Sequence, residues 1–394
     1  MISRRTLLGG LAAGAATAAL AARAVGAPAH RAAATLPLHL ANNSGAYANG
    51  SVWIYVLGND GTQQVRVTPD GRLAPVSLAD NGPDGFTDYA IPLAATGTTT
   101  VQLPPMSGRI YTSLGAKLKI KAVADGNGRP ALAYPAGWVA TDPNYDVLHD
   151  CAEFTYNSGG MFCNTTMVDM FSVPLALRLT GSGDQTTGTL KDGARARIFA
   201  DVKAAAGFDR LVIGDRRVIA PGHGLDSGLF AADYFASAID AAWSAYAAKD
   251  LTVTTNAGTF TGRVSGDQLT FTGPGTGVTP AAAGGVTFTR PSTRDVLFCD
   301  GTLAAPNDGT RGPVAAVLGA ALNRSTLATH AAQPVTDPAA FYQQPLTNHY
   351  ARAMHTATRD GKAYGFAFDD VAGFASYVED HAPKELTLTL TPFS

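Results

Sequence analysis

The chain is poor in cysteine, with only Cys151, Cys163 and Cys299 among 394 residues. An odd and small number of cysteines excludes a disulfide-stapled scaffold, so the fold must depend on its own hydrophobic core. Cys151 and Cys163 flank a glycine turn, where an oxidised pair would pin a hairpin. A bridge and two free thiols both stay open. Cys299 ends the apolar run Val296–Phe298 and is predicted to be a buried free thiol.

Charge is also scarce. Charged residues make up 15% of the chain, and the formal net charge is −2. Residues 1–34 contain four arginines and no acidic residue, so a chain that has lost them carries −6 instead of −2. A mildly acidic protein has no basic surface for nucleic acid or for an anionic membrane. We therefore expect neither as a partner.

The first 34 residues have the pattern of a targeting segment. Paired arginines in Ser3–Leu8 precede an apolar run rich in alanine and glycine, which is typical of a bacterial twin-arginine export signal. The run is broken at Arg23, too early for a membrane span of about 20 residues. An ordinary secretory signal is the alternative, and 25–27 and 32–34 are both candidate cleavage sites. Either signal predicts a secreted, extracellular protein.

Residues 35–185 are predicted to form a β-sandwich or barrel domain. Runs rich in strand formers occur at 52–57, 64–67, 99–103 and 117–121, separated by glycine- and asparagine-rich turns. The alternating C-terminal run at 385–390 is expected to return to the same sheet.

The middle of the chain has a helical pattern mixed with strands. Helices are expected at 194–206, at 230–249 with Ser227 as N-cap, at 313–323 and within 338–358, and strands within 251–272, followed by a flexible connection from 273. The predicted fold class is mainly β with a mixed α/β domain at 186–363, and strands in 364–394 that return to the β domain.

Metal and serine chemistry have little support. His349 and His355 are six residues apart, a spacing that does not share a helical face, and paired metal-binding motifs are missing. The segment 222–228 contains His223, Asp226 and Ser227, but it lacks a nucleophile elbow and is interpreted as a loop and helix cap. The sequence predicts neither a metal site nor a cofactor.

The stretch 151–180 contains the strongest chemical signal. Glu153, Thr155 and Asn157 share one face of a predicted strand, a turn follows, and the chain returns through 164–169. This hairpin would place Glu153 and Asp169 on neighbouring strands. Acids in such apolar stretches are costly unless they are paired or face a cleft, so the pair is a candidate acid and base.

The segments Glu153-Phe154-Thr155-Tyr156 and 168–174 (Val-Asp-Met-Phe-Ser-Val-Pro) resemble a thaumatin-like pattern. Within that superfamily the chain is most similar to glycoside hydrolase family 64, bacterial endo-β-1,3-glucanases that release laminaripentaose. Further similar runs are 107–111, 298–301, 348–350 and 364–370. The resemblance covers essentially the whole chain after residue 34. It implies a thaumatin-like β domain, a wide groove between two domains, a β-1,3-glucan substrate, no cofactor and a monomer.

Site residues also follow from the resemblance. It implies that Glu153 is the general acid, Asp169 the general base, and Thr155, Asn157 and Thr166 sugar contacts. Phe162 replaces a family tryptophan, so it would stack on a sugar with less area.

Thr166 and Asp169 have opposite strand parity, which requires a bulge or an early strand end. The implied mechanism is inversion, with an apolar wall or a neighbouring acid raising the pKa of Glu153 and carboxyl groups roughly 6.5–9.5 Å apart, against about 5–5.5 Å for retention. The alternative is a non-catalytic glucan-binding protein on the same scaffold.

Overall fold

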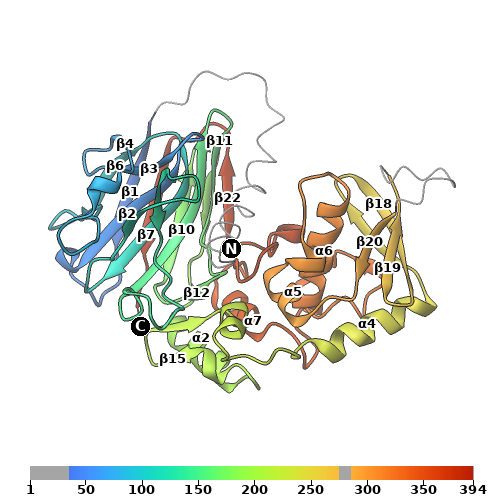
Figure 1. Cartoon of the computed structure of the whole chain (residues 1–394). Coiled ribbons are helices and arrows are strands. Elements are labelled where there is room, and N and C mark those ends of the chain that lie inside the picture. The colour runs from blue at the N-terminus through green and yellow to red at the C-terminus, as the bar shows by residue number, and fades with distance from the viewer. Residues whose placement is uncertain (1–34, 275–284, 394) are drawn as a thin grey trace.

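The fold is described from a computed structural model, which covers residues 35–274 and 285–393. The predicted export signal, and residues 275–277 of the predicted flexible connection, lie outside these ranges. Figure 1 shows a β-sandwich built from the N-terminal strands and the last strand, beside a second lobe of helices and strands from the middle of the chain. The predicted mainly β fold with an α/β part is confirmed. The domain limits at 185 and 363 stay predictions.

One sheet of the sandwich has five strands in the order β14-β13-β23-β1-β6. They are β1 (Leu36–Asn42), β6 (Thr99–Leu103), β13 (Leu175–Thr180), β14 (Asp184–Thr187) and β23 (Glu385–Leu390). The C-terminal strand β23 lies parallel to β1 and antiparallel to β13. The alternating run at the end of the chain therefore completes the first sheet, as its pattern predicts.

The second sheet has eight strands in the order β22-β11-β10-β7-β2-β3-β4, with β5 paired to β2. They are β2 (Val52–Asn59), β3 (Gln64–Val67), β4 (Leu73–Pro75), β5 (Ile91–Pro92), β7 (Met106–Leu114), β10 (Leu148–Asn157), β11 (Gly160–Asn164) and β22 (Tyr377–Asp380). A two-stranded ribbon, β8 (Lys121–Ala124) and β9 (Pro130–Ala133), lies beside it.

The strand predicted at 117–121 is wrong, because β8 begins only at Lys121. Side chains compete for the backbone there. Asn144 accepts from the N–H of Lys119 at 2.7 Å and donates to its carbonyl at 2.9 Å, while Tyr55 Oη accepts from the N–H of Leu118 at 2.9 Å. These bonds satisfy the groups that a neighbouring strand would otherwise use.

The two faces of the eight-stranded sheet have different environments. Ala152, Phe154 and Tyr156 of β10 point into the apolar core between the two sheets. Phe154 has no exposed surface, and removing such a ring costs about 3–5 kcal/mol. The alternate residues of β10, including Cys151 and Glu153, point to the opposite face. The alternation thus places an acid on the face that is not used for sandwich packing.

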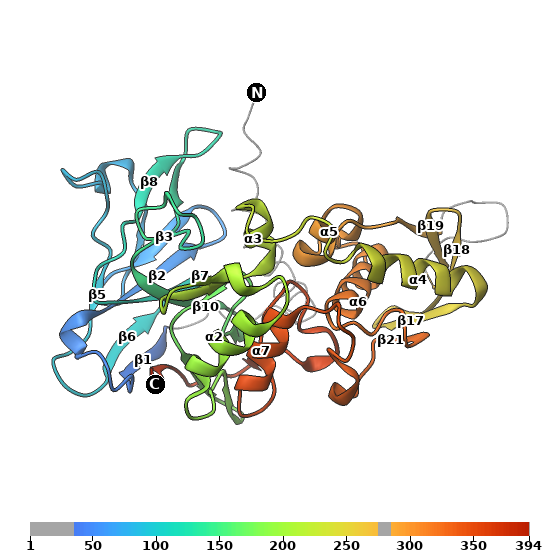
Figure 2. The ribbon, with the colours of Figure 1, turned by 90° about the horizontal axis from the view of Figure 1, so that it is seen from below.

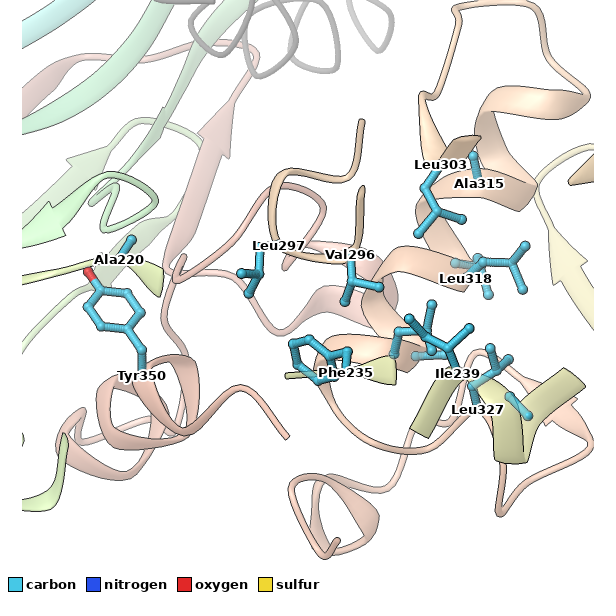
Figure 3. Packing of buried hydrophobic residues seen from close by; sticks show 14 of the residues in the cluster. Ala220, Phe235, Ile239, Val296, Leu297, Leu303, Ala315, Leu318, Leu327 and Tyr350 are labelled. Atoms are coloured by element: carbon cyan, nitrogen blue, oxygen red, sulfur yellow. The ribbon is translucent and has the colours of Figure 1, made fainter. Parts of the chain in front are cut away.

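The second lobe has its own sheet, in the order β20-β19-β18-β17-β21. Its strands are β17 (Leu251–Thr255), β18 (Gly258–Ser265), β19 (Gln268–Thr272), β20 (Val286–Thr289) and β21 (Ala332–Gln333), and its helices are α4 (Ala236–Ala248), α5 (Thr293–Phe298) and α6 (Arg311–Asn323). Figure 3 shows Phe235, Ile239, Leu318 and Leu327 packed together in this lobe.

Shorter elements connect the lobes (Figure 2). They are α2 (Ala194–Ala204), α3 (Pro221–Asp226), α7 (His349–Ala357) and the sheet of β12 (Met170–Phe171), β15 (Val212–Ile213) and β16 (Arg217–Ile219). Single 3-10 turns lie at Asn49–Ser51, Leu78–Asp80, Asp209–Leu211, Gly301–Leu303, Pro338–Ala340 and Val371–Gly373. Tyr350 of α7 donates its hydroxyl to the Met167 carbonyl at 2.6 Å, which ties α7 to the chain before β12.

The predicted helix at 230–249 begins later than expected. Ser227 is the C-cap of α3, with its hydroxyl donating to the His223 carbonyl at 2.8 Å, and α4 starts only at Ala236. Phe230 and Tyr234 instead form an aromatic cluster with Phe208, which favours an irregular connection before α4. The segment 222–228, interpreted as a loop and cap, is therefore mostly a short helix.

The three cysteines are free and buried. Cys151 lies opposite Tyr111 on the outer face of the eight-stranded sheet, whereas Cys163 lies opposite Phe154 in the sandwich core. Side chains on opposite faces of one sheet cannot be joined, so the considered Cys151–Cys163 bridge is excluded. Cys299 is the buried free thiol that its setting predicted. Within residues 35–274 and 285–393, no helix has the length and apolar character needed to cross a membrane.

Candidate active site

Glu153 lies in the middle of a row of polar residues that crosses three strands. Its register partners are Arg109 on β7 and Asn164 on β11. Arg109 donates from Nε and Nη2 to Glu153 Oε1 at 3.0 and 2.8 Å, and Asn164 Nδ2 lies 3.4 Å from Oε2. Glu153 is only 2% exposed, so these contacts largely replace water around its carboxyl group.

Asp169 is not on a neighbouring strand, so this part of the predicted hairpin is wrong. The turn is where it was expected, but β11 ends at Asn164. The chain then leaves the sheet because Thr165 and Met167 donate their N–H groups to the carbonyls of Ser376 and Tyr364, at 3.1 and 2.8 Å. Thr166 and Asp169 were expected to share a face only if the strand bulged or ended early. β11 does end early, and both residues line the same small pocket.

One guanidinium joins the two candidate catalytic carboxyl groups. Arg109 Nη1 lies 3.4 Å from Asp169 Oδ2, while Nη2 bonds Glu153. These contacts, with the roughly 2.3 Å between the terminal nitrogens of a guanidinium, limit the distance from Glu153 Oε1 to Asp169 Oδ2 to about 8.5 Å. The two groups therefore share one site, although they come from a strand and a connecting segment.

His223 holds the other oxygen of Asp169. Its Nε2 lies 2.8 Å from Asp169 Oδ1. The imidazole stacks on Trp138 with ring centroids 4.4 Å apart and meets the edge of Phe298 on α5. Both oxygens of Asp169 thus have a hydrogen-bond donor. The rings of Trp138 and Phe298 fix the orientation of the His223 imidazole.

The electrostatic setting of Asp169 favours its ionised form. Burial acts to raise the pKa of this carboxyl, but the hydrogen bond from His223 and the charge of Arg109 outweigh burial and hold the pKa below its usual value. An ionised carboxylate at this position is suited to accept a proton. The charged side chain in direct contact with Glu153 is Arg109. The apolar wall or neighbouring acid expected to act on Glu153 stays a prediction.

Two of the predicted sugar contacts lie on the Glu153 face of β10. Thr155 donates its hydroxyl to Ser107 Oγ at 3.0 Å, and Asn157 Oδ1 accepts from the N–H of Gly159 at 2.7 Å. Phe162 is the register partner of Thr155 and has no exposed surface, with its ring in edge contact with His381. A stacking platform needs an exposed ring face, which Phe162 lacks in this structure. The sugar-binding roles of all four residues, Thr166 included, stay predictions.

Sequence reasoning missed the partners of the two acids. Arg109 lies in the run 107–111 that resembles family 64, and its alternation with Tyr111 is the signal that could have found it. His223 lies in the segment 222–228, interpreted as a loop and cap, and its 54-residue separation from Asp169 gives no local pattern. In the ranges that the structure describes, no group of three or more His, Cys, Asp or Glu residues could hold a metal ion.

Glycoside hydrolases use two carboxyl groups at one site, and a buried glutamate and a partly buried aspartate that contact one arginine supply such a pair here. Residues 34–390 match the family model described as beta-1,3-glucanase, and the chain belongs to glycoside hydrolase family 64. It is 34% identical to glucan endo-1,3-beta-glucosidases of Cellulosimicrobium cellulans and of Arthrobacter sp. (strain YCWD3), over 94% of this chain and 67% of each relative. The chain is accordingly an enzyme, a glucan endo-1,3-β-glucosidase.

Solved structures agree with this assignment. A laminaripentaose-producing beta-1,3-glucanase in complex with laminaritetraose matches 92% of this chain and 100% of its own, at 37% identity and a TM-score of 0.82. A family 64 beta-1,3-glucanase domain from Clostridium beijerinckii matches 93% of this chain and 100% of its own, at 27% identity and a TM-score of 0.78. The fold is therefore that of family 64.

Proposed function

We propose that the chain is a secreted, monomeric endo-β-1,3-glucanase that cleaves linear β-1,3-glucan to laminaripentaose with inversion, without a cofactor. The observation that carries the proposal is the contact of Glu153 and Asp169 with the same guanidinium, that of Arg109. The product length is supported by the solved relative described as laminaripentaose-producing. We also propose that the sandwich is thaumatin-like, and that the glucan lies in a groove between the two lobes.

Glu153 acts as the general acid and protonates the departing glycosidic oxygen, while Asp169 activates a water on the opposite face of the sugar ring. The limit of about 8.5 Å between their oxygens admits the spacing of roughly 6.5–9.5 Å that inversion requires. It also admits the shorter spacing of a retaining pair, so the stereochemistry of the product is decisive. Thr155, Asn157, Phe162 and Thr166 are proposed to contact the glucan.

Laminarin hydrolysis followed by proton NMR tests this mechanism. Inversion of a β-linkage releases the α-anomer first, and chromatography of the same mixture gives the product length. A first product in the β-configuration would contradict inversion, and a product other than the pentaose would contradict the proposed length.

Single substitutions test the two acids. Glu153→Gln and Asp169→Asn keep shape and remove the titrating group, and each is expected to lower kcat by about 10²–10⁴-fold or more. Circular dichroism and sedimentation with insoluble β-1,3-glucan should show an unchanged fold and unchanged binding. Near-wild-type turnover by either variant would remove that residue from the mechanism.

Export is tested through the paired arginines. Replacing Arg4 and Arg5 by lysine should keep the enzyme inside a bacterial host with a twin-arginine system, whereas an ordinary secretory signal tolerates this change. Glucanase activity in the medium and in the cell extract is the measurement. Undiminished activity in the medium would favour the ordinary signal.

A further inference from the structure

The further inference concerns Asn164, the last residue of β11, and it rests on the proposed role of Glu153. Asn164 is 2% exposed, and its side chain has one polar contact, the long 3.4 Å approach of Nδ2 to Glu153 Oε2. Its Oδ1 is buried and has no hydrogen-bond partner. The amide can present only one of its two polar ends to the carboxyl group, so the favoured end depends on whether that group carries a proton.

The contacts of Arg109 indicate which oxygen of Glu153 can carry a proton. It gives two N–H groups to Glu153 Oε1 and none to Oε2. A proton on this carboxyl therefore belongs on Oε2, the oxygen beside Asn164, because Oε1 already accepts two hydrogen bonds from a cation. The carboxyl group thus has one oxygen for Arg109 and one for the proton.

We propose that Asn164 is a positioning residue for the catalytic proton, accepting a hydrogen bond from protonated Glu153 Oε2 through its Oδ1. Rotation of the amide by half a turn exchanges Nδ2 and Oδ1, and these two orientations are set by the hydrogen-bond network. With Nδ2 toward Oε2, the amide suits the ionised carboxylate. With Oδ1 toward Oε2, it suits the acid.

This arrangement offsets the effect of Arg109, which by itself favours the ionised carboxylate. A hydrogen bond that Asn164 Oδ1 accepts from neutral Glu153 stabilises the proton on Oε2. In the reaction, the proton leaves Oε2 for the glycosidic oxygen as the bond from that oxygen to the sugar breaks. The attacking water loses its proton to Asp169, and exchange with solvent then restores both carboxyl groups.

Other titratable and charged groups face Glu153 from every neighbouring element. They are Arg109 and Tyr111 on β7, Cys151 on β10, Asp169 and Tyr364 from the connecting segments, and Tyr377 and Glu379 on β22. Substitutions of Asn164 leave all of these groups in place. A shift in the pH profile that depends on the type of substitution is thus attributable to the residue beside Oε2.

Two substitutions of Asn164 should move the alkaline limb of the pH profile of kcat in opposite directions. Asn164→Leu removes the acceptor, so the limb should move to lower pH and kcat should fall about 10- to 100-fold at neutral pH, with KM within about threefold. Asn164→Asp keeps an acceptor and adds a negative charge, so the limb should move to higher pH. A residue needed only for folding would not give opposite shifts.

The leaving group gives a second readout. An aryl β-laminarioside whose phenolate leaves without protonation should be cleaved by Asn164→Leu almost as fast as by the wild-type enzyme, because the missing step is proton donation. Asn42→Leu is a matched control, since Asn42 also ends a strand and donates from its side chain to the Tyr47 carbonyl. The control should leave the pH profile unchanged.

The outcomes separate this inference from the proposed function. Unchanged alkaline limbs in both Asn164 variants, with Glu153→Gln inactive on laminarin, would overturn the role of Asn164 and keep Glu153 as the acid. Full laminarin hydrolysis by Glu153→Gln would overturn the proposed function itself. Equal losses on laminarin and on the aryl substrate, without a limb shift, would also overturn the role of Asn164.

Discussion

At the scale of single residues, the two carboxyl groups of the site differ in their partners. Asp169 has a donor on each oxygen, from His223 and from Arg109. Glu153 has two strong donors on one oxygen and a distant amide on the other. Such a difference is what an enzyme needs to keep one carboxylate ionised and another able to carry a proton.

We expect His223 to act through Asp169. A hydrogen bond to a charged group contributes about 1.5–3 kcal/mol, so His223→Ala should lower kcat roughly 10- to 100-fold. The donor from His223 lowers the pKa of Asp169, and its loss should raise that pKa. The acidic limb of kcat/KM should then move to higher pH, as measured by rates on laminarin across a pH series.

Conservative and remote substitutions complete the His223 experiment. His223→Gln retains an N–H donor of similar reach and should recover most of the activity. His39→Gln is the matched control, because His39 pairs with Glu385 at 3.2 Å on the far sheet of the sandwich. Equal activity of the alanine and wild-type enzymes would contradict a role for His223.

These residues also indicate the limits of prediction at this scale. Glu153 and Asp169 are recognisable because acids are unusual in apolar strands, and because flanking residues match a family pattern. Arg109, Asn164 and His223 lack that distinction. Their importance comes from the strand register of β7, β10 and β11 and from the placement of α3, which are tertiary facts.

At the scale of elements, the site depends on how closely α3 approaches α5. Gly222 precedes His223, and a Cβ atom at this position would lie 2.9 Å from Cζ of Phe298 and 3.1 Å from both Cε atoms. The Phe298 ring is also the one whose edge meets His223. Figure 2 shows α3 between the sandwich and α5. The close approach of Gly222 to the Phe298 ring limits where α3 can lie.

Gly222→Ala should therefore displace α3 and weaken the contact between His223 and Asp169. Overpacking of this kind costs about 1–3 kcal/mol, so we expect a lower Tm together with a several-fold loss of kcat. The double variant Gly222→Ala/Phe298→Leu should regain part of the activity, because a smaller side chain gives room for the new methyl group. Thermal unfolding and laminarin assays on the same preparations measure both effects.

Gly126→Ala is the control for this pair, because a Cβ atom at Gly126 has no neighbour within 4 Å and its φ is not in the left-handed region. It should match the wild type in Tm and in rate. Wild-type kcat in Gly222→Ala would show that the α3–α5 contact does not govern the site.

Strand alternation predicted much at this scale, including the C-terminal strand in the first sheet and the face of Glu153. It failed where side chains or later segments bind the backbone. Asn144 and Tyr55 hydrogen-bond the backbone groups of Lys119 and Leu118. The carbonyls of residues 364 and 376 accept from the N–H groups of Met167 and Thr165, just beyond the end of β11. Local periodicity cannot report such partners, because they come from distant parts of the chain.

At the scale of the whole molecule, a buried ion cluster lies where the chain returns from the second lobe to the sandwich. Asp369 has no exposed surface, and it accepts from Arg324 Nη2 at 2.9 Å, from His355 Nε2 at 2.9 Å and from the N–H of Gly365 at 2.9 Å. Arg324 follows α6, and His355 lies on α7. The cluster thus ties two helices to the segment that leads into β22.

This cluster should contribute most to the stability of the enzyme in mildly acidic solution. Burial alone lowers the pKa of His355, but Asp369 outweighs burial and raises it above 6.5, so its contribution is full below 6.5 and is lost as the pH rises through the raised value. Burial raises the pKa of Asp369, but His355 and Arg324 outweigh burial and lower it below 3.8, so its contribution is lost only as the pH falls through that lower value. Both contributions are complete between about pH 4 and 6.5.

Urea unfolding midpoints measured from pH 4 to pH 9 test this expectation. The midpoint should decline on the alkaline side in the wild type, and His355→Asn should lower it at pH 5 and flatten that decline. Asp369→Asn should cost about 3–5 kcal/mol, because it leaves Arg324 buried without its counter-ion. His349→Asn, on the same helix, is the control, because the His349 ring bonds the Pro345 carbonyl and not Asp369. Burial lowers the pKa of His349, so its loss should change the pH dependence only below 6.5 and should keep the wild-type slope on the alkaline side. If His355→Asn left the alkaline decline of the urea midpoint unchanged, a group other than His355 would have to cause that decline.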